Sequence, residues 1–253
     1  MLGPVDALVG VVITVVLAVV AALGRALTPP AAAVSAVFGS VIVVLAGFPY
    51  LGLLALFVLA SSLATHYGFE EKSRRAMQEG HHGERGISNV LAHIFLPTVV
   101  VLAGTLLPTH LPSATLSFLY ASAIAFGTSD TLASELGVLS GSARSILTGR
   151  PVPPGTNGGV SSRGEVFALV GALTTAVVGL GLLAAFSIAT VNAGVFVGGV
   201  AAAGFLGCQI DSVLGETLEN RRRLTKGSTN FAGMGSSILI GIAILLLAGA
   251  IAV

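Results

Sequence analysis

Residues 5–27 read VDALVGVVITVVLAVVAALGRAL, an apolar run with one acid, Asp6, at its start and one base, Arg25, near its end. A helix needs roughly 20 apolar residues to cross the hydrocarbon core of a bilayer, and this run is long enough. No basic residue precedes the run and its only base, Arg25, stands near its end, so we expect a retained membrane helix and not a cleaved signal peptide.

The same apolar character extends through the whole chain. Of its 253 residues 54% are hydrophobic and only 9% are charged, whereas a soluble domain carries about a quarter charged residues. We therefore predict an all-α, polytopic membrane helical bundle that forms a single integral membrane domain over residues 1–253. The second and third of its spans are short and meet at Gly47, so a re-entrant hairpin, or seven spans, stays an alternative. The eight predicted spans are 5–27, 31–47, 49–66, 87–107, 113–135, 163–187, 191–213 and 232–253.

The basic residues indicate how the bundle is oriented. All twelve Lys and Arg residues lie near Arg25 or in three polar stretches, at 68–86, 138–163 and 214–230. Two spans separate each stretch from the next, so these stretches share one side of the membrane, which the positive-inside rule assigns to the cytoplasm. The opposite connections, around Gly47, Pro108–Pro112 and Ser187–Asn192, contain no Lys, Arg, Asp or Glu. We expect a multi-pass protein of a prokaryotic plasma membrane, with an active site at the cytoplasmic face.

Four acids form a repeat at the cytoplasmic ends of the fifth and seventh spans. The copies read Asp130-Thr-Leu-Ala-Ser-Glu135 and Asp211-Ser-Val-Leu-Gly-Glu216. On a continuous helix this spacing leaves the two carboxylates about 140° apart, but Gly137 and Gly215 indicate that the helices end or loosen there. Carboxylates at a membrane boundary are costly, and they are the oxygen ligands that Mg²⁺ prefers. A chance repeat is the alternative to a metal site formed by Asp130, Glu135, Asp211 and Glu216.

The segment between the two acid copies, residues 150–165, reads RPVPPGTNGGVSSRGE. Prolines stiffen such a segment, glycines let backbone N–H groups approach a ligand, and serines cap a following helix. A glycine-rich turn before a helix N-terminus is typical of an anion site. The segment matches neither the P-loop nor the dinucleotide-binding fingerprint, which excludes those two classes. A flexible connecting loop is the alternative.

These motifs resemble those of a known family. The stretches Gly127–Gly137, Pro153–Ser161 and Asp211–Gly215 are similar to the membrane family that includes plant phytyl-phosphate kinase and its archaeal and bacterial relatives. That family is distantly similar to phytol and dolichol kinases and to CDP-diacylglycerol synthases. The resemblance implies a Mg²⁺-dependent kinase that transfers the γ-phosphoryl group of CTP, or another nucleoside triphosphate, to an isoprenyl monophosphate of the phytyl or geranylgeranyl type. Its expected partners are the nucleotide, the isoprenyl monophosphate and membrane lipid, with no nucleic acid; a homodimer stays open.

The resemblance also implies residue roles. Asp130 and Asp211 would hold Mg²⁺ for catalysis, and Lys72, Arg85, Arg150 and Arg163 would neutralise the charge that develops during phosphoryl transfer. Asn157 and the amides of Gly158 and Gly159 would cradle phosphate. The complete set of expected substrate-binding residues is Asn89, Arg150, Pro154, Gly155, Thr156, Asn157, Gly158, Gly159, Ser161, Arg163 and Ser212.

Two other functions stay open at this point. A cytidylyltransferase would use the same groups to form a CDP-lipid and release pyrophosphate. A transporter of a lipid or an anion would also contain acids near the membrane, but it would need polar groups at the bilayer midplane and access from both sides. The one-sided charge favours an enzyme. Within the fourth span, His93 is expected to hydrogen-bond between helices.

Overall fold

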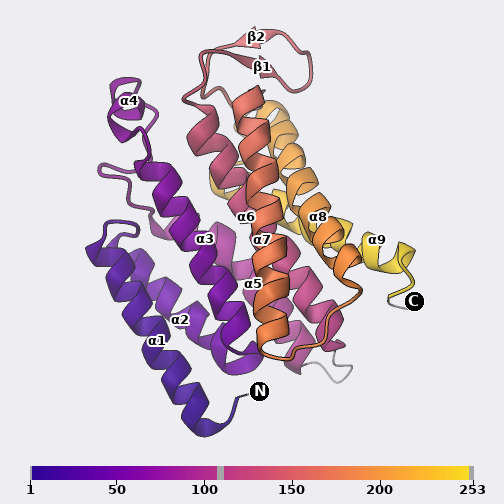
Figure 1. Ribbon diagram of the computed structural model, residues 1–253. Helices are drawn as coiled ribbons and strands as arrows, with labels where there is room; N and C mark the ends of the chain where they lie inside the picture. The colour runs from indigo at the N-terminus through magenta and orange to yellow at the C-terminus, as the bar shows by residue number, and fades with distance from the viewer. Residues whose placement is uncertain (1, 107–110, 251–253) are drawn as a thin grey trace.

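The computed structural model describes residues 2–106 and 111–250, and within them the chain is almost entirely helical (Figure 1). Part of the predicted connection Pro108–Pro112 and the end of the last predicted span lie outside the described residues. The helices are α1 (Pro4–Leu23), α2 (Pro29–Ala46), α3 (Phe48–His66), α4 (Phe69–Arg74), α5 (Ile87–Leu106), α6 (Ser113–Gly137), α7 (Ser162–Ala185), α8 (Ala193–Leu214) with a π-helical continuation η1 (Gly215–Glu219), and α9 (Lys226–Leu247).

Seven of the described helices are long and apolar enough to cross a bilayer, namely α1, α2, α3, α5, α7, α8 with η1, and α9. Helix α6 has 25 residues but is less apolar. Helices α2 and α3 are separate helices of 18 and 19 residues that meet at Gly47, and whether both cross the bilayer or form a re-entrant hairpin stays a prediction. The prediction of a helical membrane bundle is confirmed.

Side-chain caps mark where several helices begin. The hydroxyl of Thr28 accepts from the amide of Ala31 before α2, and Thr225 forms a capping box with Ser228 before α9. The carboxamide oxygen of Asn192 accepts from two amides at the start of α8. Each cap satisfies N–H groups that have no partner within the helix, which is required where water is scarce.

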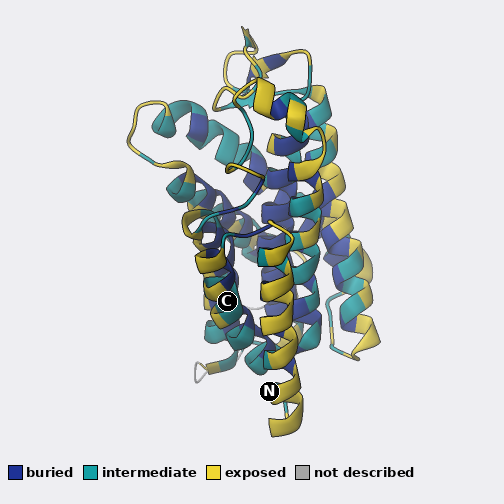
Figure 2. Cartoon of the chain, turned by 90° about the vertical axis from the view of Figure 1, so that its left-hand side faces the viewer, coloured by how far each residue is buried: buried dark blue, intermediate teal, exposed yellow. Residues whose placement is uncertain are grey.

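Helix α6 lies at the centre of the bundle, in contact with α3, α5, α7, α8 and α9. Eighteen of its 25 residues are buried. The outer helices instead expose much of their apolar surface, most clearly α1 (Figure 2). The bundle therefore has a protein-enclosed centre and a periphery suited to lipid.

Glycines bring the neighbouring helices close against α6. A Cβ atom added to Gly204 of α8 would lie 2.6 Å from the Cβ of Ala125, and one added to Gly171 of α7 would lie 2.9 Å from the carbonyl oxygen of Thr128. Such approach of backbones is the usual way in which membrane helices gain packing energy.

The polar stretch between α6 and α7 folds into a small antiparallel sheet that the sequence analysis did not predict. Its strands are β1 (Ala143–Ser145), β2 (Pro151–Val152) and β3 (Gly159–Val160), in the order β2-β1-β3. Arg144 pairs with Pro151 on one side and with Val160 on the other. The sheet and α4 lie at the same end of the bundle, and the connection between α7 and α8 lies at the opposite end (Figure 1).

Replacing Gly204 by Val should destabilise the protein by roughly 1–3 kcal/mol, because the new side chain forces α8 away from the backbone of α6. Gly198→Val is the matched control, since it lies in the same helix with open space around it. Thermal unfolding in detergent micelles measures both. Equal losses in the two variants would contradict the close approach as the cause.

Candidate functional site

A cavity of about 380 Å³ lies at the charged end of the bundle. Its walls come from the end of α6, the end of α8, the start of α9, the glycine-rich segment and residues 76–79 of the polar stretch after α4. Asp130 of α6 and Asp211 of α8 both line it. Of the four acids of the repeat, Asp130, Glu135 and Asp211 line this cavity together with the glycine-rich segment, whereas Glu216 does not.

The cavity is strongly acidic. Among the described residues that line it, six carry carboxylates and only Lys226 carries an ammonium group. Four of the carboxylates have partners in the protein. Glu79 pairs with Lys226 at 3.6 Å, Glu165 accepts from Gln209, Glu219 accepts from Asn157, and Glu135 pairs with Lys72.

Asp130 and Asp211 are the two exceptions. Among the described residues, no group donates a hydrogen bond to either carboxylate, and Oδ1 of Asp211 is buried without a partner. Buried carboxylate oxygens normally have hydrogen-bond partners, so an oxygen without one is available to a ligand. Among the six carboxylates of this cavity, those of the two Asp residues are therefore the ones that are free to bind a cation.

The helix that carries Asp211 changes form immediately after it. Helix α8 passes into the π-helical turn η1 at Gly215, as the sequence analysis expected when it predicted a loosening there. Single π turns in α-helices occur frequently at functional sites. The wider turn places Glu219 on the cavity wall, whereas Glu216 lies outside it.

Glu216 is not part of a four-acid metal site. Its carboxylate accepts from the hydroxyl of Ser145 at 2.6 Å and from the amide of Leu147. It thus fastens the small sheet to η1. Within residues 2–106 and 111–250, no three His, Cys, Asp or Glu side chains form a group that could hold a metal ion.

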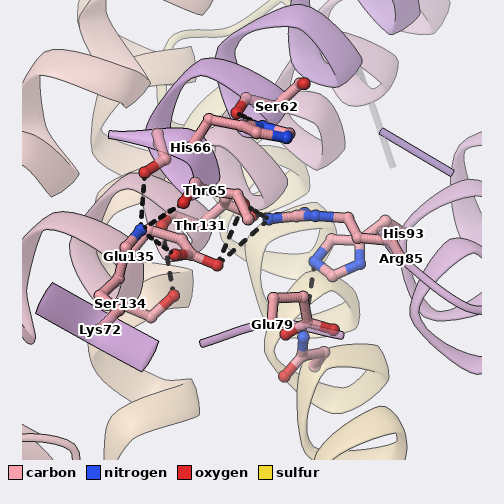
Figure 3. A network of polar contacts seen from close by, with 12 residues as sticks. Ser62, Thr65, His66, Lys72, Glu79, Arg85, His93, Thr131, Ser134 and Glu135 are labelled. Atoms are coloured by element: carbon pink, nitrogen blue, oxygen red, sulfur yellow. Dashed lines mark hydrogen bonds and ion pairs between the residues drawn. The ribbon is translucent and has the colours of Figure 1, made fainter. Parts of the chain in front are cut away.

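Lys72 and Glu135 form a buried ion pair, at 2.6 Å, instead of facing substrate (Figure 3). The ammonium group of Lys72 also donates to the carbonyl oxygens of Ala64 and Thr65, so all three of its protons are used. Lys72 is fully buried and does not line the cavity. The expectation that Lys72 neutralises phosphate, and that Glu135 is free to bind metal, is therefore wrong.

Arg85 approaches the same carboxylate from the other side. Its guanidinium donates to the hydroxyls of Thr65 and Thr131 and lies 3.8 Å from Oε1 of Glu135 (Figure 3). Burial lowers the pKa of Arg85, and the negative charge of Glu135 opposes that shift. Arg85 lines a second, smaller cavity of about 30 Å³, so its expected contact with the nucleotide is not seen.

Three other expected site residues also lie away from the acidic cavity. Asn89 lines the second cavity, and its carbonyl oxygen is hydrogen-bonded to the ring of His93. Arg150 is exposed beside the small sheet. The guanidinium of Arg163 lies over the rings of Tyr67 and Phe167, at 5.7 and 5.9 Å from their centroids. The sequence alone could not show that Arg150 and Arg163 lie away from the cavity whereas another basic residue, Lys226, lines it.

The expected residues of the glycine-rich segment do line the cavity, namely Pro154, Gly155, Thr156, Asn157, Gly158, Gly159 and Ser161. Ser212 of α8 lines it too. Gly158 has a φ of +75°, and an added Cβ would lie against the side chain of Glu216, so only glycine fits there. The amide of Gly159 donates to the carbonyl oxygen of Thr156 at 2.8 Å. That amide is therefore not free to cradle phosphate, contrary to expectation.

Ser161 caps α7 as predicted. Its hydroxyl accepts from the amide of Gly164 at 3.0 Å and donates to the carbonyl oxygen of Gly137 at 3.3 Å. It thereby joins the last residue of α6 to the first turn of α7 along the cavity wall.

Lys226 and Asn230 line the cavity and were missed by the sequence analysis. Both belong to the first turns of α9, one turn apart. A usable signal existed, because Thr225 and Ser228 have the spacing of a helix cap and place Lys226 at the first position of the helix.

The long apolar helices and the charged end define a multi-pass integral membrane protein. The chain belongs to the family described as integral membrane protein DUF92, which it matches over residues 12–246. An uncharacterized membrane protein of Methanocaldococcus jannaschii, MJ0933, is 30% identical over 93% of both chains. An uncharacterized membrane protein of Synechocystis, sll0875, is 32% identical over 76% of this chain and 73% of its own. Protein PGR of Arabidopsis thaliana is 35% identical over 69% of this chain and 66% of its own. No solved structure matches the chain.

Replacing Lys72 by Met should cost about 3–5 kcal/mol of stability, because Glu135 would keep a buried charge without its partner. Arg75→Met is the matched control, since its pair with Glu71 is solvent-exposed and is worth about 0–1 kcal/mol. Chemical unfolding in detergent gives both values. A loss for Lys72→Met as small as that of the control would contradict a buried pair.

Proposed function

We propose that this protein is a Mg²⁺-dependent kinase that transfers the γ-phosphoryl group of CTP, or another nucleoside triphosphate, to an isoprenyl monophosphate. The observation that carries the proposal is the pair of unpartnered carboxylates, Asp130 and Asp211, in one cavity beside the glycine-rich segment. The proposal adds that the charged end faces the cytoplasm of a prokaryotic cell, in line with the positive-inside rule.

The charge of the cavity supports a metal-dependent reaction. Six carboxylates repel a bare triphosphate, so the anion needs a cation to enter with it. Mg²⁺ is usually held by one or two carboxylates together with substrate phosphates and water, and two free Asp side chains fit that requirement. When bound, the ion would neutralise the charge on the transferred phosphoryl group.

The residues of the chain then have distinct tasks. Lys226 is the cation of the cavity that can approach phosphate, in place of the four basic residues expected from the sequence. The hydroxyls of Thr156 and Ser212 and the turn at Gly158 form other parts of the cavity wall. The acceptor phosphate is already an anionic nucleophile at neutral pH, so the site needs no strong general base.

A cytidylyltransferase is the second candidate. The same two Asp carboxylates could hold Mg²⁺ for attack on the α-phosphorus of the nucleotide as well as on the γ-phosphorus. Transport of a lipid or an anion is less well supported. Apart from Asp6 at the start of α1, the charged residues gather at one end of the bundle, and the connection between α7 and α8 at the other end contains no charged residue.

Labelled nucleotide decides between these reactions. Purified protein is incubated with Mg²⁺, geranylgeranyl or phytyl phosphate, and CTP carrying label at either the α- or the γ-phosphate. Entry of γ-label into lipid, with release of CDP, supports the kinase. Entry of α-label with release of pyrophosphate would establish the cytidylyltransferase instead, and no label in lipid from either nucleotide would reject both.

Asp130→Asn and Asp211→Asn should each lower turnover by a factor of at least about a hundred, because each removes a charge that holds Mg²⁺ without changing side-chain shape. Asp6→Asn, in the exposed first turn of α1, is the control and should keep full activity. Turnover is measured at saturating Mg²⁺, and unfolding curves confirm that the variants fold. Near-normal turnover of either variant removes that residue from the metal site.

A further inference from the structure

Asn230 occupies a position between the acidic cavity and the buried ring of His93. It lines the cavity, is 5% exposed, and lies one helical turn after Lys226 on the same face of α9. This face of α9 lies against α8, because a Cβ added to Gly233 would be 3.0 Å from the Cβ of Asp211. Asn230 thus lines the same cavity as the two free carboxylates.

The hydrogen bonds of His93 determine which ring nitrogen carries the proton. Nδ1 lies 2.9 Å from the backbone carbonyl oxygen of Asn89, and a carbonyl oxygen can only accept. Nδ1 must therefore carry hydrogen. In a neutral imidazole the other nitrogen, Nε2, is then an acceptor. The ring cannot turn freely, since it is stacked against Phe57 and Phe126.

This tautomer in turn orients the carboxamide of Asn230. Nε2 of His93 lies 3.5 Å from Asn230, and as an acceptor it needs a donor, which only the amide nitrogen Nδ2 supplies. The amide oxygen Oδ1 is then the atom turned away from His93. Within the described residues the carboxamide of Asn230 has a hydrogen-bond contact through Nδ2, to His93, and none through Oδ1.

We propose that Asn230 presents its amide oxygen to the cation held by Asp130 and Asp211, and that His93 is the positioning residue that fixes this orientation. The proposal rests on the proposed metal-dependent function. Of the carboxylates that line the described part of the cavity, only those of Asp130 and Asp211 have no partner, and the thiol of Cys208 is too soft a ligand for Mg²⁺, so further oxygen ligands must come from other groups. Amide oxygens are ordinary ligands of hard divalent cations.

Binding of Mn²⁺ alone, followed by electron paramagnetic resonance without nucleotide, tests the ligand role. Mn²⁺ accepts the same oxygen ligands as Mg²⁺. Asn230→Leu keeps the size of the side chain but removes the oxygen, and should weaken Mn²⁺ binding about tenfold or more. Asn230→Asp keeps an oxygen and should bind at least as tightly as the natural protein. A purely structural role of Asn230 predicts that both variants lose binding equally, or that neither does, and either result overturns the proposal.

Two further variants separate orientation from general damage. His93→Phe keeps the aromatic stack but has no acceptor, so the amide of Asn230 can turn and Mn²⁺ binding should weaken several-fold. Asn192→Leu removes the cap at the start of α8, whereas the cavity lies at the other end of that helix. This variant should lower stability without changing Mn²⁺ binding. If Asn230→Leu does not fold, unchanged Mn²⁺ binding by His93→Phe rejects the positioning role.

The tautomer of His93 is an independent readout. Nitrogen chemical shifts of ¹⁵N-labelled histidine, assigned by comparison with His93→Phe, should show hydrogen on Nδ1 and none on Nε2. Hydrogen on Nε2 would reverse the amide and overturn the proposal. Failure of the kinase function is distinguishable, because tight Mn²⁺ binding that depends on Asn230 without any transfer of label would reject the kinase alone.

Discussion

The enclosure of α6 by five other helices is the constraint on which the rest of the structure depends. A helix surrounded by protein can carry polar side chains that lipid would not tolerate, provided that they find partners. Ser122 and Thr128 donate to carbonyl oxygens of the preceding turn, and Ser129 donates across to Ala168 of α7. Because these groups are satisfied, α6 can deliver Asp130 to a protected position at its far end.

Glu135 connects this central helix to the segment that covers the cavity. Lys72 follows α3 and Arg85 precedes α5, so the two cations lie at either end of the segment, and both face the same carboxylate. Between them, residues 76–79 form part of the cavity wall. Glu135, with its two cationic partners, therefore ties the dozen or so residues between Lys72 and Arg85 to α6. Because both cations are beside Glu135, neither pairs with Asp130 or Asp211.

Local signals predicted much of the fold. The apolar runs gave the spans, Ser161 caps α7, and Gly215 marks the point where α8 loosens, since each of these depends on neighbours in the sequence. The assignments that failed depend on tertiary partners. Lys72 and Arg150 are both basic residues in polar stretches, but one is buried against Glu135 and the other is exposed, and spacing carries no information about that difference. The strands β1 to β3 are too short to have a periodic pattern. Whether Asp130 and Asp211 hold a metal stays a prediction.

The ion pair between Glu79 and Lys226 has a consequence for how charged molecules can enter the cavity. Under the proposed function, an anion that binds Lys226 would displace Glu79 and leave one more unpaired negative charge in the cavity that Asp130 and Asp211 line. That charge would attract a cation, and a cation already in place would lower the cost of the displacement. By thermodynamic linkage each ion must then strengthen the binding of the other by the same factor. Under the proposed function, the cavity would therefore bind the anion and the cation cooperatively.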